Sequence, residues 1–159
     1  GKYLGFEEDP EDYSALDFNF DTDVTLLASQ GELYNALNSD LSAFQESGGK
    51  MIMWHGLADP LVLPNQSQDY FESVREVMGE RNTKSFYRLF MAPGLGHCWE
   101  LPAVTPDQMD MLSALERWVE EDIAPDSIEV TQFRDDGSIN RRGILRPYPL
   151  LAEYSAVEN

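Results

Sequence analysis

Two continuous hydrophobic runs lie in the middle of the chain, at residues 50–55 (KMIMWH) and 86–91 (FYRLFM). Runs of this length and apolarity are typical of strands that are buried on both faces of a parallel sheet. Each run ends in a turn that contains glycine, residues 56–60 (GLADP) after the first and 93–96 (PGLG) after the second. The pattern therefore predicts two strands, each followed by a loop at its carboxyl end.

Helical spacing appears around and between these strands. Asn65 with Gln68 resembles a capping box, and Gly79 is a typical helix end, so a helix is predicted between the two runs. Its apolar positions follow helical spacing: Tyr70, Val74, Val77 and Met78. A shorter helix is predicted before residue 50, capped by Ser39-Asp40 and ended by Gly48-Gly49.

The remainder of the chain predicts one more helix and a hairpin. Residues 105–108 (TPDQ) combine a cap, a proline at the first helical position and a reciprocal glutamine, and the helix should end before Ala124-Pro125. Its predicted apolar face is Met111, Leu112, Leu115, Trp118 and Val119. Residues 127–133 and 144–148, joined by a turn at Asp136-Gly137, predict a peripheral hairpin.

The order strand, helix, strand, helix predicts an α/β fold with parallel strands joined by a right-handed crossover. At 159 residues the chain has the size of one domain with one core. Residues 1–25 are acidic and aromatic with little periodicity, and predict an extended or loop segment held to an apolar surface by Tyr13, Phe18 and Phe20.

Composition argues against several functions. The net charge of -18 disfavours nucleic-acid binding, and no apolar run approaches the roughly 20 residues that a membrane helix needs. Cys98 is the only cysteine, so neither an internal disulfide nor a Cys/His zinc site is expected. The acidic residues of 17–23 alternate as in a calcium loop, but Thr22 and Ala28 replace the required glycine and glutamate. We expect no metal and no cofactor in this chain.

The two loops carry the candidate chemistry. Asp59 and His97 both lie just beyond the ends of consecutive strands, where active sites of parallel sheets gather. If the two strands are neighbours, the Asp59 carboxylate can accept a hydrogen bond from the His97 imidazole N–H. This pair would be the acid and the base of a catalytic triad, without its nucleophile. The simpler alternatives are that His97 caps or packs a loop and that Asp59 belongs to an ordinary Asp-Pro turn. His55 also ends a strand, and we interpret it as structural or as a hydrogen-bonding neighbour.

A nucleophile for such a triad is not apparent. In α/β-hydrolases the serine precedes the acid, but no G-x-S-x-G motif occurs here. None of the upstream serines has the strand–elbow–helix setting: Ser14, Ser29, Ser39, Ser42 and Ser47. The first 49 residues also cannot supply the strands that precede the acid in this fold. We therefore expect residues 1–159 to be the C-terminal segment of a single catalytic domain whose nucleophile-bearing half lies elsewhere.

Several segments resemble the C-terminal portion of the tannase and feruloyl esterase family, over roughly residues 17–155. They are residues 17–23 (DFNFDTD), 40–74, 86–98 (FYRLFMAPGLGHC), 112–128 and 146–149 (RPYP). The combination of H-G-x-x-D-P with P-G-x-G-H-C is more specific than either motif alone. The resemblance implies an α/β-hydrolase sheet, of which this chain holds the last two core strands with flanking helices and a peripheral hairpin.

The resemblance also implies roles for individual residues. Asp59 would be the triad acid, His97 the base, and Cys98 the partner of a cysteine beside the missing serine. A free thiol on a buried turn is the alternative for Cys98. Residues 99–101 (WEL) replace a glycine-rich continuation, and Arg146 stands where a cysteine often precedes P-Y-P, which removes a peripheral disulfide. The family's lid and calcium site belong to the missing part.

The function implied is that of a secreted or periplasmic serine carboxylester hydrolase acting on phenolic-acid esters, such as feruloyl or galloyl esters. The expected partner is the missing N-terminal half of the same enzyme, without which the open sheet edge favours self-association. The alternatives are a non-catalytic remnant or binding module, and an α/β-hydrolase with another substrate, such as a peptidase or thioesterase.

Overall fold

The computed structural model describes residues 12–97 and 105–156. The chain divides into two compact units, Gly1–Asn38 and Ser39–Asn159, and each is described by itself. This division does not test the prediction that residues 1–159 belong to a single catalytic domain.

The described part of the first unit is more helical than its sequence suggests. It contains a 3-10 turn η1 (Ala15–Asp17), α2 (Asp23–Leu26) and α3 (Ala28–Tyr34). The Ser14 side chain caps η1 in a reciprocal capping box with Asp17. The expectation of an extended segment held down by its aromatic residues is wrong for Phe20, which is 81% exposed and contacts Phe18 edge-to-face.

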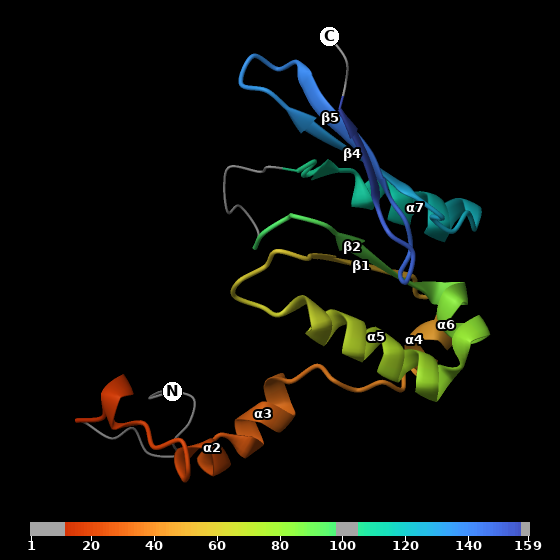
Figure 1. Cartoon of the computed structure of the whole chain (residues 1–159). Helices are drawn as coiled ribbons and strands as arrows, with labels where there is room; N and C mark the ends of the chain where they lie inside the picture. The colour runs from red at the N-terminus through yellow and green to blue at the C-terminus, as the bar shows by residue number, and fades with distance from the viewer. Residues whose placement is uncertain (1–11, 98–104, 157–159) are drawn as a thin grey trace. The chain divides into compact units, whose positions relative to one another are not determined.

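The second unit is built on two parallel strands, β1 (Met51–Gly56) and β2 (Tyr87–Ala92), as predicted (Figure 1). Their register pairs Met51 with Tyr87 and Gly56 with Ala92, so both strands end at the same edge. The crossover between them contains α5 (Pro64–Met78) and a further helix that the sequence pattern did not predict, α6 (Glu80–Phe86). Gly79 ends α5 with a positive φ of 81°, which favours glycine.

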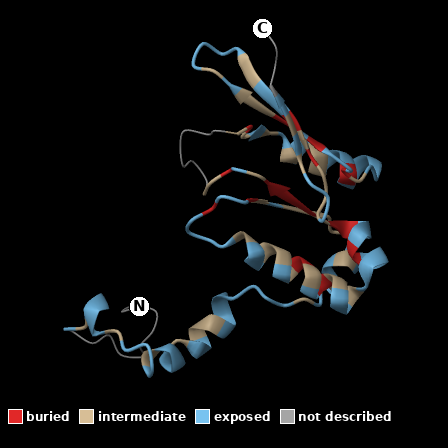
Figure 2. Cartoon of the chain, in the orientation of Figure 1, coloured by how far each residue is buried: buried red, intermediate tan, exposed pale blue. Residues whose placement is uncertain are grey.

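β2 lies at the centre of the hydrophobic core. All of its residues except Arg88 are buried, and Figure 2 shows this strand in red. Successive side chains point to opposite faces of a strand. On one face Tyr87, Leu89 and Met91 pack with Phe71 and Val74 of α5. On the other face Phe90 and Ala92 belong to a second cluster, with Ile128, Val130 and Leu145 from the C-terminal part of the chain.

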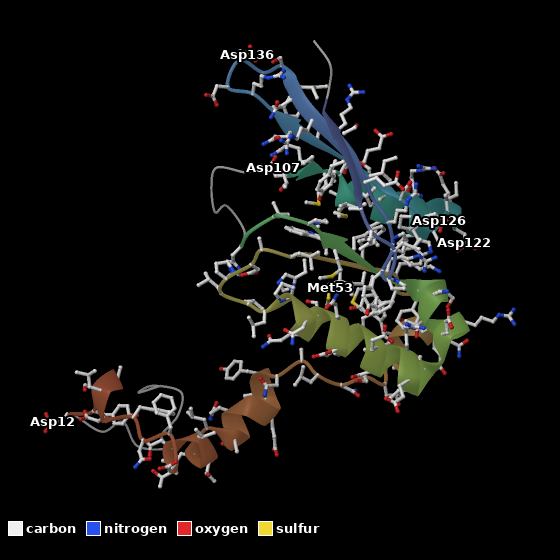
Figure 3. All side chains as sticks on the ribbon, in the orientation of Figure 1. Asp12, Met53, Asp107, Asp122, Asp126 and Asp136 are labelled. Atoms are coloured by element: carbon white, nitrogen blue, oxygen red, sulfur yellow. The ribbon has the colours of Figure 1, made fainter. Side chains whose placement is uncertain are left out.

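β1 is less buried than its continuous hydrophobic run predicts. Met51 and Met53 pack into the α5 cluster, and Figure 3 shows Met53 between the strand and this helix. Trp54 points to the opposite face and is 41% exposed. Within the described residues β1 pairs only with β2, so its second edge has no strand beside it.

Helices α5 and α4 (Ser42–Glu46) begin close to their predicted caps, and the predicted cap is present only in part. α5 begins at Pro64 after Leu63, without a side-chain cap, so the predicted capping box at Asn65 and Gln68 is wrong. Proline suits this position because its missing N–H would have no helical partner. α4 follows Leu41, while the Asp40 carboxylate accepts a hydrogen bond from the Ser42 amide at 3.0 Å.

The predicted start of the last helix at residues 105–108 is also wrong. The segment instead forms the short strand β3 (Gln108–Met109), and the Asp107 amide donates to the Thr131 carbonyl. Helix α7 (Met111–Glu121) begins after Asp110, whose carboxylate accepts from the Ser113 amide at 2.9 Å.

The apolar face of α7 is only partly buried in this chain. Trp118 is 1% exposed and lies beneath the cationic groups of Lys50 and Arg88, at 5.4 and 5.0 Å from its ring centre. Leu112 and Val119 were assigned to the same face, but they are 66% and 59% exposed.

The predicted hairpin is present and belongs to a larger sheet, although its second strand begins at Ile139 and not at Ile144. β4 (Ile128–Phe133) and β5 (Ile139–Leu145) pair antiparallel between β3 and β6 (Glu153–Ala156). Ile128, Val130 and Leu145 of this sheet share a buried cluster with β2. The Tyr148 amide then donates to the Leu89 carbonyl at 2.7 Å. This packing covers the face of β2 that α5 leaves open (Figure 1).

Candidate active site

The loops that follow β1 and β2 are joined to each other by backbone hydrogen bonds. The Leu57 amide donates to the Ala92 carbonyl at 2.9 Å, and the Ala58 amide donates to the Leu95 carbonyl at 3.0 Å. Gly56 allows this close approach, because a Cβ atom there would lie 2.2 Å from the Leu95 oxygen. Asp59 and His97 each lie within two residues of these bonds, so the backbone places them together.

The Asp59 carboxylate is held by its own turn. Asp59 is 8% exposed, and its Oδ1 accepts hydrogen bonds from the Leu61 and Val62 amides, each at 2.9 Å. Pro60 has no amide hydrogen to offer and its ring restricts the turn. The turn occupies Oδ1 and leaves Oδ2 for other partners.

His97 donates to that second oxygen. Its Nδ1 lies 2.7 Å from Asp59 Oδ2, and its side chain is 32% exposed whereas that of Asp59 is 6% exposed. Because an ionised carboxylate only accepts, Nδ1 carries the proton and a neutral His97 presents Nε2 as an acceptor. Within the described residues, Nε2 has no hydrogen-bond partner. The predicted pairing of Asp59 with His97 is therefore present, and its catalytic role stays a prediction.

Burial alone would raise the pKa of the Asp59 carboxyl. The hydrogen bonds from the Val62 amide, the His97 ring and the Leu61 amide, together with the charge on His97, instead lower this pKa far below its ordinary value. The carboxylate is thus ionised over the whole range of neutral pH, as a group that stabilises an imidazolium must be.

His55 contacts the same carboxylate from the other side. Its Nε2 lies 3.2 Å from Asp59 Oδ2 and 3.1 Å from the Val62 carbonyl oxygen, and its Nδ1 lies 2.7 Å from Ser67 Oγ. The interpretation of His55 as a hydrogen-bonding neighbour agrees with this geometry. Sequence reasoning missed Ser67, although the alternation that turns Met51, Met53 and His55 toward α5 was a usable signal.

Other predicted residues lie apart from this pair. Cys98 and residues 99–101 fall outside the described residues. Arg146 forms an ion pair with Glu153 at 3.1 Å. In the described part of the chain, no group of three or more His, Cys, Asp or Glu side chains is arranged to hold a metal ion, and no helix is long and apolar enough to cross a membrane.

A cavity of about 370 Å³ lies at the opposite end of β2, with Arg75, Lys84, Arg88 and Asp126 among its lining residues. Two of its basic groups are paired with acids, Arg75 with Glu72 and Glu80, and Lys84 also with Glu80. The third, Arg88, donates to the carbonyls of Lys84 and Tyr87. Neither Asp59 nor His97 lines this cavity, so it is separate from the candidate active site.

Comparison with known protein families covers nearly the whole chain. The model of the family described as "Tannase and feruloyl esterase" matches residues 4–158. The chain belongs to the tannase and feruloyl esterase family. The predicted resemblance is thus confirmed, and the relatives are esterases and other ester hydrolases by name.

Two relatives illustrate the similarity to known proteins. Mono(2-hydroxyethyl) terephthalate hydrolase from Piscinibacter sakaiensis is 35% identical over 149 residues, which cover 87% of this chain and 24% of that protein. A protein described as "Probable feruloyl esterase" from Arthroderma benhamiae is 35% identical over 152 residues, covering 87% of this chain and 28% of its own length. The chain thus spans about a quarter of the length of these relatives.

The same family provides a similar solved structure. The crystal structure of feruloyl esterase B from Aspergillus oryzae superposes with a TM-score of 0.81 at 25% identity, over 93% of this chain and 32% of that one. The predicted α/β fold class is therefore confirmed.

Proposed function

We propose that this chain supplies the acid and the base of a serine carboxylester hydrolase. The observation that carries the proposal is the 2.7 Å contact between His97 Nδ1 and Asp59 Oδ2, at the carboxyl ends of two neighbouring parallel strands. Membership of the tannase and feruloyl esterase family supports the same reaction class. The serine is supplied by a part of the enzyme outside this chain.

The proposed reaction uses both nitrogens of His97. As the serine oxygen attacks the ester carbonyl, His97 Nε2 takes the serine proton, and Asp59 stabilises the imidazolium that forms. The tetrahedral intermediate collapses when Nε2 returns this proton to the alkoxy oxygen, which leaves as an alcohol. Water then attacks the acyl-enzyme, with Nε2 again accepting a proton and passing it to the serine as the acid departs. Backbone amides outside the chain would stabilise the oxyanion.

We propose phenolic-acid esters, such as feruloyl or galloyl esters, as substrates. The names of the relatives support an aromatic acyl group, since they refer to feruloyl and terephthalate esters. The loop beside Asp59 supports it too, because its apolar side chains are exposed next to the candidate site: Leu57, Leu61, Val62 and Leu63. Selection among such acids would belong to the lid in the remainder of the enzyme.

The remainder of the enzyme is also the proposed partner of this chain. The free edge of β1, the exposed side chain of Trp54 and the exposed apolar residues of α7 support a larger sheet and helices that continue beyond residues 39–156. Without that partner the edge would favour self-association. We further propose that Cys98 forms a disulfide with a cysteine beside the serine, in a secreted or periplasmic enzyme.

The function is tested by assaying the whole enzyme, expressed with the part that precedes this chain. The assay measures hydrolysis of methyl ferulate and of methyl gallate. We expect turnover in the wild type and none above background in His97→Ala. Asn140→Ala is the matched control, because it removes a partly buried polar side chain with one hydrogen bond far from Asp59. A folded wild type inert toward both esters would overturn the proposal and favour a non-catalytic module. Cleavage of only thioesters or peptides would favour another hydrolase.

A further inference from the structure

His55 differs from an ordinary core histidine, because both of its ring nitrogens are engaged and one of them reaches the proposed acid. Its side chain is 11% exposed, less than the 32% of His97. The ring lies between Ser67 on the first turns of α5 and Asp59 in the loop after β1. It thus connects a rigid helix to a loop.

The contacts determine the tautomer of a neutral His55. Nε2 lies within hydrogen-bond distance of two acceptors, the Asp59 carboxylate at 3.2 Å and the Val62 carbonyl at 3.1 Å. It must therefore carry a proton, since two acceptors offer none. Nδ1 is then the acceptor and receives the hydroxyl hydrogen of Ser67, at 2.7 Å. Every polar atom of the ring is satisfied in this arrangement.

The same arrangement completes the shell of Asp59. Oδ1 accepts from the Leu61 and Val62 amides, and Oδ2 accepts from two imidazoles, His97 at 2.7 Å and His55 at 3.2 Å. Four donors match the roughly four lone-pair sites of a carboxylate. Only one of the two donors to Oδ2 belongs to the proposed base. The other fixes this oxygen independently of any movement of His97.

We propose that His55, oriented by Ser67, is a positioning residue that fixes the Asp59 carboxylate for His97. This inference rests on the proposed function, because it assigns His55 a part in the same triad. The order of contacts runs from Ser67 on α5 through His55 and Asp59 to His97. The contact between His55 Nε2 and the Val62 carbonyl oxygen also links the loop of residues 57–62 to the end of β1.

Three variants of the whole protein separate positioning from folding. His55→Leu removes every contact, and kcat should fall about ten- to a hundredfold with KM nearly unchanged, the scale expected when a catalytic group is misplaced. His55→Gln places an amide nitrogen at the same number of bonds from the backbone as Nε2, so it should recover most of kcat. Ser67→Ala should lower kcat about three- to tenfold, the effect of one hydrogen bond.

A control variant and a double variant complete the kinetic test of His55 and Ser67. Ser73→Ala is the matched control, because this serine lies on the same helix and bonds only the Asp69 carbonyl. Adding Ser67→Ala to His55→Leu should change nothing further, since both act through one contact chain. The proposal is overturned if His55→Leu keeps wild-type kcat, or if the Gln and Leu variants lose activity equally while both are folded.

Histidine-selective ¹⁵N NMR of the whole protein provides a readout that does not need activity. The His55 signals, assigned by their loss in His55→Gln, should show a protonated Nε2 and an unprotonated Nδ1. Ser67→Ala should move the Nδ1 signal, and Ser73→Ala should leave it in place. A proton on Nδ1 alone would overturn the inference, because Nε2 would then have nothing to donate to Asp59. This result is independent of whether the enzyme hydrolyses any ester.

Discussion

The two histidines of this chain bind the same carboxylate oxygen and differ in everything around it. His55 ends β1, is nearly buried, and has both nitrogens engaged by Asp59, Val62 and Ser67. His97 follows β2, is 32% exposed, and within the described residues uses only Nδ1. The His55 ring is held on both sides by hydrogen bonds. In the described part of the chain the Nε2 side of His97 is open, and a nucleophile and a substrate would approach from there.

The difference shows that contact with an acid does not by itself indicate a general base. A base also needs a second nitrogen that is free to accept and release a proton. On this criterion the roles proposed for His55 and His97 rest on their second nitrogens and on their exposure.

The largest effect is expected for His97→Ala in the whole enzyme. We expect kcat to fall by about 10⁴-fold or more, because the proton acceptor is lost, whereas the free energy of unfolding should change little for a partly exposed side chain. Ester hydrolysis and chemical denaturation measure the two quantities. A larger loss of activity in His55→Leu than in His97→Ala would reverse the assignment.

Asp59→Asn should come next. The amide keeps the shape but cannot stabilise an imidazolium, so kcat should fall by about 10³- to 10⁴-fold. Asp69→Asn, a change of the same kind on α5, is the control and should leave kcat unaltered. Steady-state kinetics decide this prediction, and an Asp59→Asn enzyme with kcat near that of the control would exclude Asp59 as the triad acid.

Gly56→Ala should disturb both histidines at once, through the backbone. The new methyl group would overlap the Leu95 carbonyl, so we expect a loss of about 1–3 kcal/mol or more in the free energy of unfolding. Gly31→Ala is the control, because its Cβ would meet only the flexible side chain of Asn35, and its effect should stay within about 1 kcal/mol. Urea denaturation of both variants measures the difference, and equal stability would contradict the tight contact.

The smallest effect concerns pH. The pKa of Asp59 is lowered in the folded protein, so above the ordinary carboxyl pKa of about 3.9 its ionisation contributes its full stabilisation. As the pH falls below that value toward the folded pKa, the unfolded chain binds the proton first, and this contribution is lost. Thermal unfolding from pH 7 down to pH 3 should show a drop that is smaller in Asp59→Asn. If the melting temperatures of the wild type and of Asp59→Asn fall by the same amount over this pH range, the lowered pKa of Asp59 in the folded protein is refuted.

Much of the β1–β2 unit is predictable because its signals are local. Continuous apolar runs predict both strands, and strands that run in a common direction place Asp59 and His97 at one edge, where the structure has them. Helix starts were harder. Residues 105–108 have the composition of a cap, but their backbone groups gain partners on β4, and Asp110 caps α7 instead. Pairing between distant segments outweighed local preference.

The amino-acid sequence alone predicted the two strands and the positions of Asp59 and His97 just beyond their ends, because hydrophobic periodicity and residue type act over a few neighbouring positions. The arrangement of Ser67, His55 and Asp59 depended on how α5 lies across β1, as did the position of the C-terminal sheet against β2. Such contacts join residues that are far apart or on different elements, and their free energy comes from packing of the folded chain. The chain thus encodes its reactive pair locally and the support for that pair only through the fold.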